Sequence, residues 1–207
     1  MPVWSSNSEG LAAEVEVYYD ISSPYTYLAF TRLFSIVERY GAKLTLLPVY
    51  LGGLFKALGR ALPPPSKLMY MQKDLDDWAS FLGVPLKFPS VFPLNSIQVQ
   101  RGAVWMKDRG LEEDYVKCVF PAYWVGDRDL SKDEELLDIV NSLGVDPQDF
   151  LRGVCSEEVK QKLREITEAA LSRGVFGVPT FFVSGEMFWG NDRLPFVEKK
   201  LEGSKRS

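Results

Sequence analysis

The chain has 207 residues, enough for one sizeable core, and its 46% hydrophobic and 25% charged residues are typical of a globular protein. A net charge of −4 excludes a global basic surface for nucleic acid, and no apolar run reaches the ~18 residues that a membrane span needs. The absence of histidine excludes Ser-His-Asp triads, Cys-His dyads, His-ligated zinc and a histidine base. A catalyst built from this sequence must activate its nucleophile in another way.

The first part of the chain predicts a strand, a helix and a second strand. Residues 14–20 alternate in polarity and then turn apolar, which indicates a strand. Ser23 and Pro24 form a helix start, because Ser caps a helix and Pro fits its first position. The helix is expected over residues 25–40 and the second strand over residues 43–51. Together they form a βαβ unit.

A proline run at residues 63–65 marks a junction, after which the chain is mostly helical up to residue 173. Pro121 is expected to end or kink one of these helices, and the segment from Ser131 to Glu134 has the pattern of a capping box. Apolar spacing and glycine stops predict helices over residues 67–82, 96–109, 112–124 and 131–143, a short helix that opens at Asp146-Pro147, and one over 156–173.

Strand character returns near the end of the chain. Residues 180–183 and 186–189 predict two strands joined by a Ser-Gly turn, and residues 195–202 predict a closing helix. The order βαβ, helices, ββα is typical of an α/β protein with a helical insertion. Residues 1–12 lack a basic start and an apolar segment, so they predict a loose tail and not a secretory signal, and residues 203–207 predict a frayed end.

The two cysteines, Cys118 and Cys155, lie far apart in the sequence, and neither belongs to a C-x-x-C motif. We expect both to be free, buried and inert thiols. This usage fits a reducing compartment, with the cytoplasm as the default location.

The first candidate site is the turn with Ser22 and Ser23, at the junction of the first strand and the first helix. A helix N-terminus offers free N–H groups and positive potential, which favour an anion. A serine hydroxyl there can donate to a thiolate, a bond worth ~1.5–3 kcal/mol that moves a thiol pKa from ~8.5 toward neutrality. The alternative is that either serine only caps the helix.

Two other turns are candidates for binding. Pro179 directly before a strand predicts a special turn, with a cis Val178–Pro179 bond as one option. Such a turn would present the Val178 N–H and C=O to a cleft, whereas the alternative is an ordinary edge turn. Near the closing helix, Asn191 or Asp192 either only caps that helix, or Asp192 and neighbouring N–H groups take the charged ends of a ligand.

Several segments together match a known family in their order along the chain. They include Tyr-Asp-Ile-Ser-Ser-Pro-Tyr-Thr-Tyr-Leu at residues 19–28, Phe-Gly-Val-Pro-Thr-Phe at 176–181 and Met-Phe-Trp-Gly-Asn-Asp-Arg-Leu at 187–194. They resemble the 2-hydroxychromene-2-carboxylate isomerases and kappa-class glutathione transferases, in the DsbA-like branch of the thioredoxin superfamily. Residues 70–75 and 83–89 also look like this family, and the resemblance covers residues 15–201.

This resemblance implies an α/β, thioredoxin-like fold with an inserted all-helical domain of the DsbA or kappa type. Residues 13–62 and 174–203 would form the discontinuous thioredoxin-like domain, and residues 63–173 the insertion. Ser23 would stand where a thioredoxin has its nucleophilic cysteine, with Thr26 at the second cysteine position. The thiol must then be brought in as the cofactor glutathione, and no metal is implied.

The resemblance also implies which residues hold glutathione. Val178 would pair with its cysteinyl backbone, and residues 189–192 would hold its γ-glutamyl end. Lys67 matches a family lysine near the glycyl carboxylate, although a solvated lysine at a helix start fits equally. The implied glutathione-binding set is Ser23, Lys67, Val178, Pro179, Trp189, Gly190, Asn191 and Asp192, with Ser23 as the catalytic residue.

Lys56 and Arg60 are candidates for contact with the acceptor substrate. The family usually has Gly-Asn where this chain has Gly59-Arg60. An arginine there suits an anionic acceptor, because it can pair with a carboxylate through two hydrogen bonds.

The resemblance implies glutathione-dependent isomerisation of an aromatic-derived acid, in which the thiolate adds to a conjugated carbon, a bond rotates and the thiol leaves. Residues 188–194 are closer to the isomerases than to the transferases. The alternatives are a kappa-like glutathione transferase, which consumes thiol, and a redox-inert glutathione-binding protein, while a DsbA-type oxidoreductase is disfavoured because C-x-x-C is missing. The expected partners are glutathione and a small aromatic or electrophilic substrate, without nucleic acid or membrane. A homodimer is allowed, and kappa relatives can also lie in organelles.

Overall fold

The computed structural model describes residues 13–60 and 64–205. The tail predicted over residues 1–12 and the predicted 62/63 domain boundary lie outside the described residues. Four strands form one mixed sheet in the order β2-β1-β3-β4, with β1 parallel to β2 and antiparallel to β3. Their bounds are β1 (Glu14–Tyr19), β2 (Lys43–Pro48), β3 (Thr180–Val183) and β4 (Glu186–Trp189).

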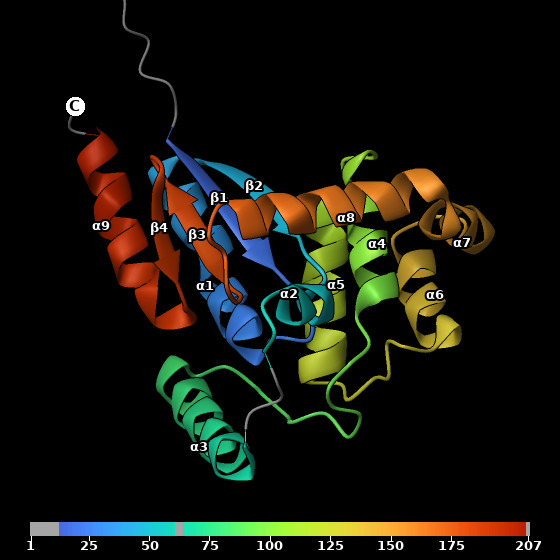
Figure 1. Ribbon diagram of the computed structural model, residues 1–207, viewed down its shortest axis with the longest axis horizontal. Coiled ribbons are helices and arrows are strands. Elements are labelled where there is room, and N and C mark those ends of the chain that lie inside the picture. The colour runs from blue at the N-terminus through green and yellow to red at the C-terminus, as the bar shows by residue number, and fades with distance from the viewer. Residues whose placement is uncertain (1–12, 61–63, 206–207) are drawn as a thin grey trace, which may run out of the picture.

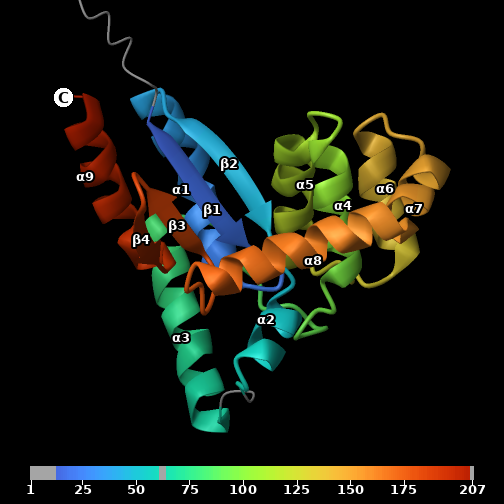
Figure 2. The ribbon, with the colours of Figure 1, turned by 45° about the horizontal axis from the view of Figure 1, so that its top comes forward.

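Helices cover both faces of this sheet (Figure 1). Val15, Val17 and Tyr19 of β1 belong to the buried cluster that contains residues of α1 (Pro24–Tyr40) and α9 (Leu194–Lys205). Tyr18 points to the other face, where it is buried in a cluster with residues of α2 (Leu51–Ala57) and α8 (Glu157–Ser172). Alternation along a single strand therefore supplies both hydrophobic layers, and Figure 2 shows α8 crossing the sheet.

The βαβ unit forms as the sequence predicts, with two differences at its end. Ser23 caps α1, and Gly41 ends it with a left-handed φ of 59°. The strand β2 stops at Pro48, so the predicted strand end at residue 51 is wrong. The unpredicted helix α2 begins at Leu51, whose N–H donates to the carboxylate of Asp20 at 2.7 Å. This tertiary contact offsets the weak helix propensity of the glycine pair that follows.

Most helices of the region between β2 and β3 lie where they are predicted. Pro121 does not end α5, because the helix continues through it to Trp124. The predicted capping box is wrong, because Ser131 Oγ donates to Asp129 Oδ1 at 2.6 Å and Lys132 is the N-cap residue without a side-chain bond. The bounds are α3 (Pro65–Leu82), α4 (Ile97–Lys107), α5 (Glu112–Trp124), α6 (Asp133–Ser142) and α7 (Pro147–Cys155).

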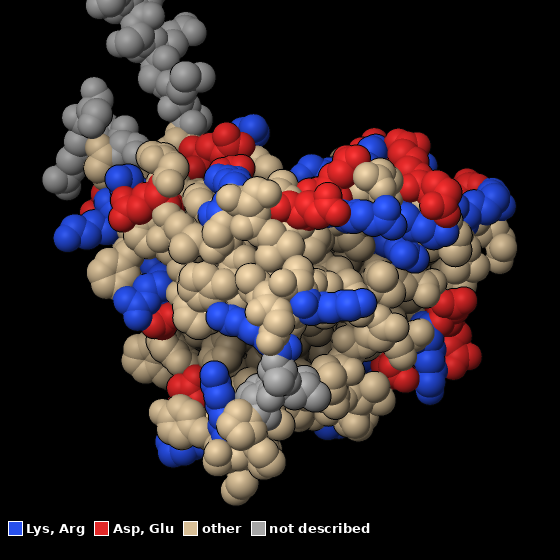
Figure 3. Space-filling view, viewed as in Figure 1, with Lys and Arg blue, Asp and Glu red and all other residues tan. Residues whose placement is uncertain are grey.

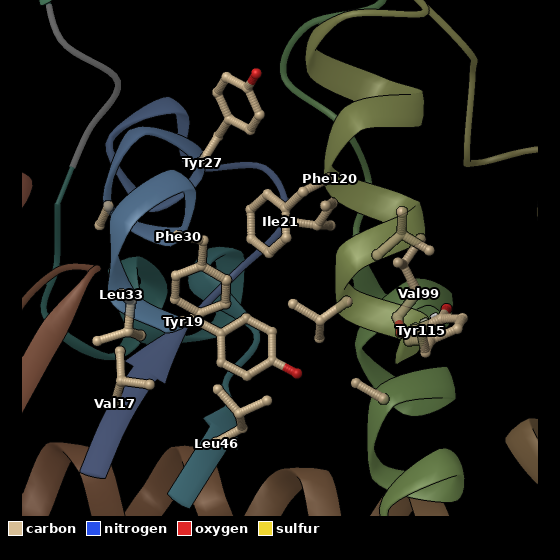
Figure 4. Packing of buried hydrophobic residues seen from close by; sticks show 14 of the residues in the cluster. Val17, Tyr19, Ile21, Tyr27, Phe30, Leu33, Leu46, Val99, Tyr115 and Phe120 are labelled. Atoms are coloured by element: carbon tan, nitrogen blue, oxygen red, sulfur yellow. Dashed lines mark hydrogen bonds between the residues drawn. The ribbon is translucent and has the colours of Figure 1, made fainter. Parts of the chain in front are cut away.

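One buried cluster joins the sheet to these helices (Figure 4). The rings of Tyr19 from β1, Phe30 from α1 and Phe120 from α5 lie with centroids 5.0–6.3 Å apart. Side chains of both predicted domains thus share a core, and the predicted division at 62/63 and 173/174 stays a prediction.

Two smaller predictions about the chain are wrong. Both cysteines are free, as expected, but Cys155 is exposed and Cys118 only half-buried, so the expectation of buried thiols fails. Partial burial, with Asp114 nearby, raises the pKa of the Cys118 thiol and keeps it in the unreactive form. At the C-terminus, α9 extends to Lys205 through residues that were expected to fray.

Candidate active site

Ser23 lies at the N-cap of α1, directly after the carboxyl end of β1. Its Oγ accepts a hydrogen bond from the Thr26 N–H at 3.3 Å and donates one to the Val178 carbonyl oxygen at 3.1 Å. The residue is 4% exposed. Ser23 therefore caps the helix by accepting a hydrogen bond through an oxygen lone pair. Its hydroxyl proton points at the carbonyl on the opposite turn and can be donated to another acceptor instead.

A second hydroxyl group lies on the same turn of α1. Thr26 is fully buried, and its Oγ1 has no hydrogen-bond partner within the described parts of the chain. A buried hydroxyl without a partner costs ~1–3 kcal/mol. The first turn of α1 thus holds an unsatisfied polar atom at the second position of the Ser-x-x-Thr motif.

The turn before β3 faces Ser23. Its Val178–Pro179 peptide bond is cis, which confirms the option considered from the sequence. The Pro179 carbonyl accepts from the Gly190 N–H at 2.9 Å, which ties this turn to the end of β4. A Cβ on Gly177 would stand 2.8 Å from Trp189 Nε1, so only glycine leaves room for the indole.

The buried carboxylate of Asp20 holds the Ser23 turn in place through hydrogen bonds. Asp20 Oδ1 accepts from the N–H and Oγ of Ser22, both at 2.8 Å. Its Oδ2 accepts from Leu51 N–H at 2.7 Å and Ser96 Oγ at 2.9 Å. Burial raises the pKa of Asp20, and the donated hydrogen bonds oppose that change. Through Asp20, the turn is fastened to the first residue of α2 and to Ser96 at the start of α4.

In the predicted γ-glutamyl end, residues 189–192, Asp192 and Asn191 differ in exposure. Asp192 is exposed and pairs with Arg193 at 2.8 Å. Asn191 is buried, and its Oδ1 and carbonyl oxygen accept from Arg32 Nη2 at 3.1 and 3.0 Å. Gly190 has a φ of 112°, and a Cβ there would stand 2.5 Å from an Asp192 carboxylate oxygen. Asp192 can therefore reach a ligand with its side chain, whereas the Asn191 side chain is already bound.

Tyr25 extends this end of the site toward α3. Its hydroxyl donates to Asp74 at 2.8 Å. Burial and this hydrogen bond, with smaller effects from the charges of Asp74 and Asp192, raise the pKa of the Tyr25 phenol, which stays protonated. Two carboxylates thus act on one hydroxyl at this end of the site.

An aromatic and cationic rim lies on the other side of the cis-proline turn. The Phe176 and Trp189 rings contact edge to face, with centroids 4.7 Å apart, and Trp189 is 47% exposed. Arg60 lies over the Phe176 ring at 5.6 Å, and its Nη1 donates to the Phe176 carbonyl at 3.0 Å. Lys56 and Lys67 are exposed, and no hydrogen bond or ion pair among the described residues links either to this group.

The described residues hold neither a cluster of metal-ligating side chains nor a membrane-spanning helix. No three Asp, Glu or Cys side chains in residues 13–60 and 64–205 gather as metal ligands would. No helix in the same ranges is long and apolar enough to cross a bilayer. In the space-filling view, Lys and Arg side chains lie around the centre of this face, whereas over α8 they are mixed with Asp and Glu side chains (Figure 3).

Comparison with known proteins shows the family to which the chain belongs. A family model described as a DSBA-like thioredoxin domain matches residues 14–202. The chain belongs to that family. It is 35% identical over 201 residues to the 2-hydroxychromene-2-carboxylate isomerase of Pseudomonas sp. strain C18, covering 95% of this chain and 93% of that protein. Glutathione S-transferase kappa 1 of Homo sapiens is 29% identical over 209 residues, which is 92% of each chain.

A solved structure of a 2-hydroxychromene-2-carboxylate isomerase matches with a TM-score of 0.85 at 33% identity, covering 93% of this chain and 96% of that one. The DsbA-type thioredoxin-like fold expected from the sequence is therefore confirmed, as is the relation to the isomerases and kappa transferases. These relatives are enzymes, and the protein is an enzyme of this isomerase and transferase group.

Sequence reasoning missed the residues that hold the site in shape. Gln100 and Arg32 carry no motif, and Asp20 was given no role although it stands in the matched segment 19–28. Each of the three acts through partners distant in sequence. Gln100, for example, donates to the carbonyls of Tyr19 and Val49, both at 2.9 Å. The one available signal was an aspartate at the end of a strand, directly before a helix start.

Proposed function

We propose that the protein is a glutathione-dependent isomerase that acts on an aromatic-derived acid and resembles 2-hydroxychromene-2-carboxylate isomerase. The observation that carries this proposal is the Ser23 hydroxyl at the N-terminus of α1, 3.1 Å from the Val178 carbonyl. No cysteine accompanies it, since the chain has only Cys118 and Cys155, both in other helices. The identity to three isomerases, 30–35%, supports the choice of reaction.

The groups around Ser23 fit glutathione. The orphaned Thr26 hydroxyl and the Ser23 hydroxyl lie together on the first turn of α1, where the helix dipole favours an anion such as a thiolate. The Val178 backbone suits the peptide of the cysteinyl residue, and the exposed Asp192 carboxylate suits an ammonium group. Lys67, exposed on the first turn of α3, suits the glycyl carboxylate.

When bound, glutathione supplies the nucleophilic sulfur. Ser23 would donate its O–H to that sulfur in place of the Val178 carbonyl, and this carbonyl would then accept a backbone N–H of the ligand. The number of hydrogen bonds at Val178 is thereby conserved. The Ser23 donor and the positive end of α1 both favour the deprotonated sulfur, whose proton passes to solvent because the chain has no histidine base.

Arg60 and Lys56 would hold the acceptor. Arg60 lies at the rim made by Phe176 and Trp189, and within the described ranges its guanidinium makes one hydrogen bond, to the Phe176 carbonyl. Its remaining N–H groups suit a carboxylate on the substrate. The two rings offer an apolar surface for an aromatic body. An aromatic acid therefore matches both the arginine and the rings of the rim.

Product analysis with glutathione tests the proposal. The protein is assayed with a 2-hydroxychromene-2-carboxylate, and free thiol is titrated alongside the product. An isomerase converts the substrate with no net loss of thiol, whereas a transferase consumes one thiol per product. The transferase is the second candidate, favoured by 29–30% identity to mammalian kappa enzymes. A protein that binds glutathione without either reaction would be the redox-inert alternative.

We further propose a reducing location such as the cytoplasm and a homodimeric assembly. Two unpaired cysteines, one of them exposed, support the location. Sedimentation of the purified chain tests the assembly, and a single species with the 23.4 kDa mass of one chain would contradict the dimer.

A further inference from the structure

A cavity of about 290 Å³ lies between α2, α4 and α8. Tyr50 and Ala57 line it from the α2 side, Arg101 from α4, and Lys160 and Thr167 from α8. None of the residues assigned above to glutathione or the acceptor lines it. Lys56, which lies on α2, and Arg60, which follows this helix, are the two residues proposed to hold the acceptor, and neither is among the residues that line the cavity. The cavity is thus a second hollow, outside the proposed active site.

The polar side of this cavity is cationic. Arg101, Lys160 and Arg164 line it, against the single carboxylate of Glu168. Arg101 is the key member, because its Nε is buried and finds no hydrogen-bond partner among the described residues. Buried N–H groups in native proteins are nearly always paired, with protein or with another molecule. An acceptor for Arg101 is therefore missing from the part of the chain that the structure describes.

The neighbouring cations are partly engaged. Lys160 pairs with the exposed Glu157 at 2.6 Å, and Arg164 donates to Gln161 Oε1 at 3.0 Å. These partners lie one turn away on the surface of α8, and each cation keeps further N–H groups. The cavity retains an excess of positive charge, with Arg101 as its least satisfied donor.

The other side of the cavity is apolar and built around Tyr50. A Cβ on Gly52 would stand 2.9 Å from the Tyr50 ring, and one on Gly53 3.1 Å from it. Adjacent glycines weaken a helix, so their presence in α2 makes room for the ring. Tyr50 is held further by its N–H, which donates to Thr167 Oγ1 at 3.2 Å. Leu163 and Leu171 complete the apolar wall.

We propose that this cavity is a second binding site, for a small anionic molecule with an apolar body, such as an aromatic carboxylate. Its volume is near the lower limit of the ~300–1,000 Å³ found for small-molecule sites, which favours one or two fused rings over a peptide or nucleotide. The carboxylate meets Arg101, whose Nε gains its acceptor, and the rings lie against Tyr50 and the leucines.

The test uses 2-naphthoate as the probe and the full chain as the protein. Calorimetric titration is done with and without saturating glutathione, and with the uncharged 2-naphthamide for comparison. We expect 2-naphthoate to bind to the wild type in the presence of glutathione. We also expect it to bind to Ser23→Ala with the same affinity as to the wild type. The amide should bind at least tenfold more weakly, because it lacks the charge that Arg101 requires.

Arg101→Met removes the cation and keeps the length of the side chain. It should weaken 2-naphthoate binding by tenfold or more, whereas Arg152→Met, which removes an exposed cation from α7, should leave it unchanged. Arg101→Met should also keep the wild-type melting temperature, since no described hydrogen bond is lost. If that variant fails to fold, Ala57→Phe, which fills the cavity from α2, must abolish binding instead.

Several results would overturn the proposal. These are no 2-naphthoate binding at millimolar concentration, equal binding of acid and amide, displacement by glutathione, or unchanged affinity in both Arg101→Met and Ala57→Phe. The test is independent of the proposed isomerase activity, because Ser23→Ala is expected to lower that activity, whereas Ser23 does not line the cavity.

Discussion

Replacing Ser23 by alanine deletes one oxygen atom with two hydrogen bonds in the structure. Loss of the N-cap bond from the Thr26 N–H costs ~0.5–2 kcal/mol, and loss of the bond to the Val178 carbonyl ~0.5–1.5 kcal/mol. The free energy of unfolding should therefore fall by about 1–3 kcal/mol. If the hydroxyl also donates to the glutathione thiolate, turnover should fall by ~10- to 1000-fold, the range for losing one donor to a developing charge.

A matched control separates these two effects. Ser156 caps α8 with the same geometry, accepting from the Val159 N–H at 3.3 Å and donating to the Gly153 carbonyl at 2.7 Å. Ser156→Ala should lower the free energy of unfolding by a similar amount, because it removes the same kinds of bonds. It should leave turnover unchanged, because no element of the proposed active site contains it.

The assay follows thiolate absorbance in the ultraviolet for the glutathione complexes of wild type, Ser23→Ala and Ser156→Ala as pH is varied. Glutathione should still bind to Ser23→Ala, through the Val178 backbone and Asp192, but its thiol should ionise at a higher pH. Equal titration curves for wild type and Ser23→Ala, or full activity in that variant, would reduce Ser23 to a helix cap and refute the mechanism.

Asp192→Ala should raise the KM for glutathione with little change in kcat, because a contact to the ammonium group is equally strong in the ground and transition states. Steady-state kinetics at varied glutathione would measure both constants, and an unchanged KM would leave Asp192 without a binding role. Replacing both Cys118 and Cys155 by alanine should keep turnover per folded molecule, measured against the folded fraction, and inactivity in a folded double variant would assign a thiol to the chemistry. Burial raises the pKa of Glu112 to about 7 from 4.5, so the folded protein holds a proton that the unfolded chain releases between these values. Its contribution to the free energy of unfolding is present at pH 4.5 and declines by up to about 3 kcal/mol by pH 7.5. Glu112→Gln should remove that decline in urea unfolding at the two pH values, and a persistent slope would place its origin elsewhere.

Local signals in the sequence were sufficient for most elements. The Ser23-Pro24 pair and Gly41 bound α1 because capping and left-handed turns depend on a few adjacent residues. The same holds for Asp146, which caps α7 by accepting from two N–H groups at 2.8 Å. Such features need no knowledge of the rest of the fold, and their prediction rests on short-range chemistry.

Features set by distant contacts escaped prediction. The helix α2 begins where Leu51 meets Asp20, a partner 31 residues away, and its glycines argue against a helix. Ser131 lost its predicted capping role because α6 begins only at Asp133, with Lys132 as its N-cap residue, and the Ser131 hydroxyl donates to Asp129 instead. In the site, Ser23 and the cis-proline turn were predictable from motifs, whereas the Arg32 bonds to Asn191 span 159 residues and leave no local trace.

The position of β1 within the sheet has a consequence for how the chain is made. Its parallel partner β2 ends at Pro48, but its other neighbour pairs Val15 with Val183. During synthesis one edge of β1 therefore stays unpaired until β3 leaves the ribosome, which happens only after the whole helical region has been made. An open apolar edge of this kind invites pairing with other nascent chains, and closing a loop of such length is slow. Overexpression at high synthesis rates should accordingly favour aggregates more than it would for a protein whose sheet is built from neighbouring hairpins.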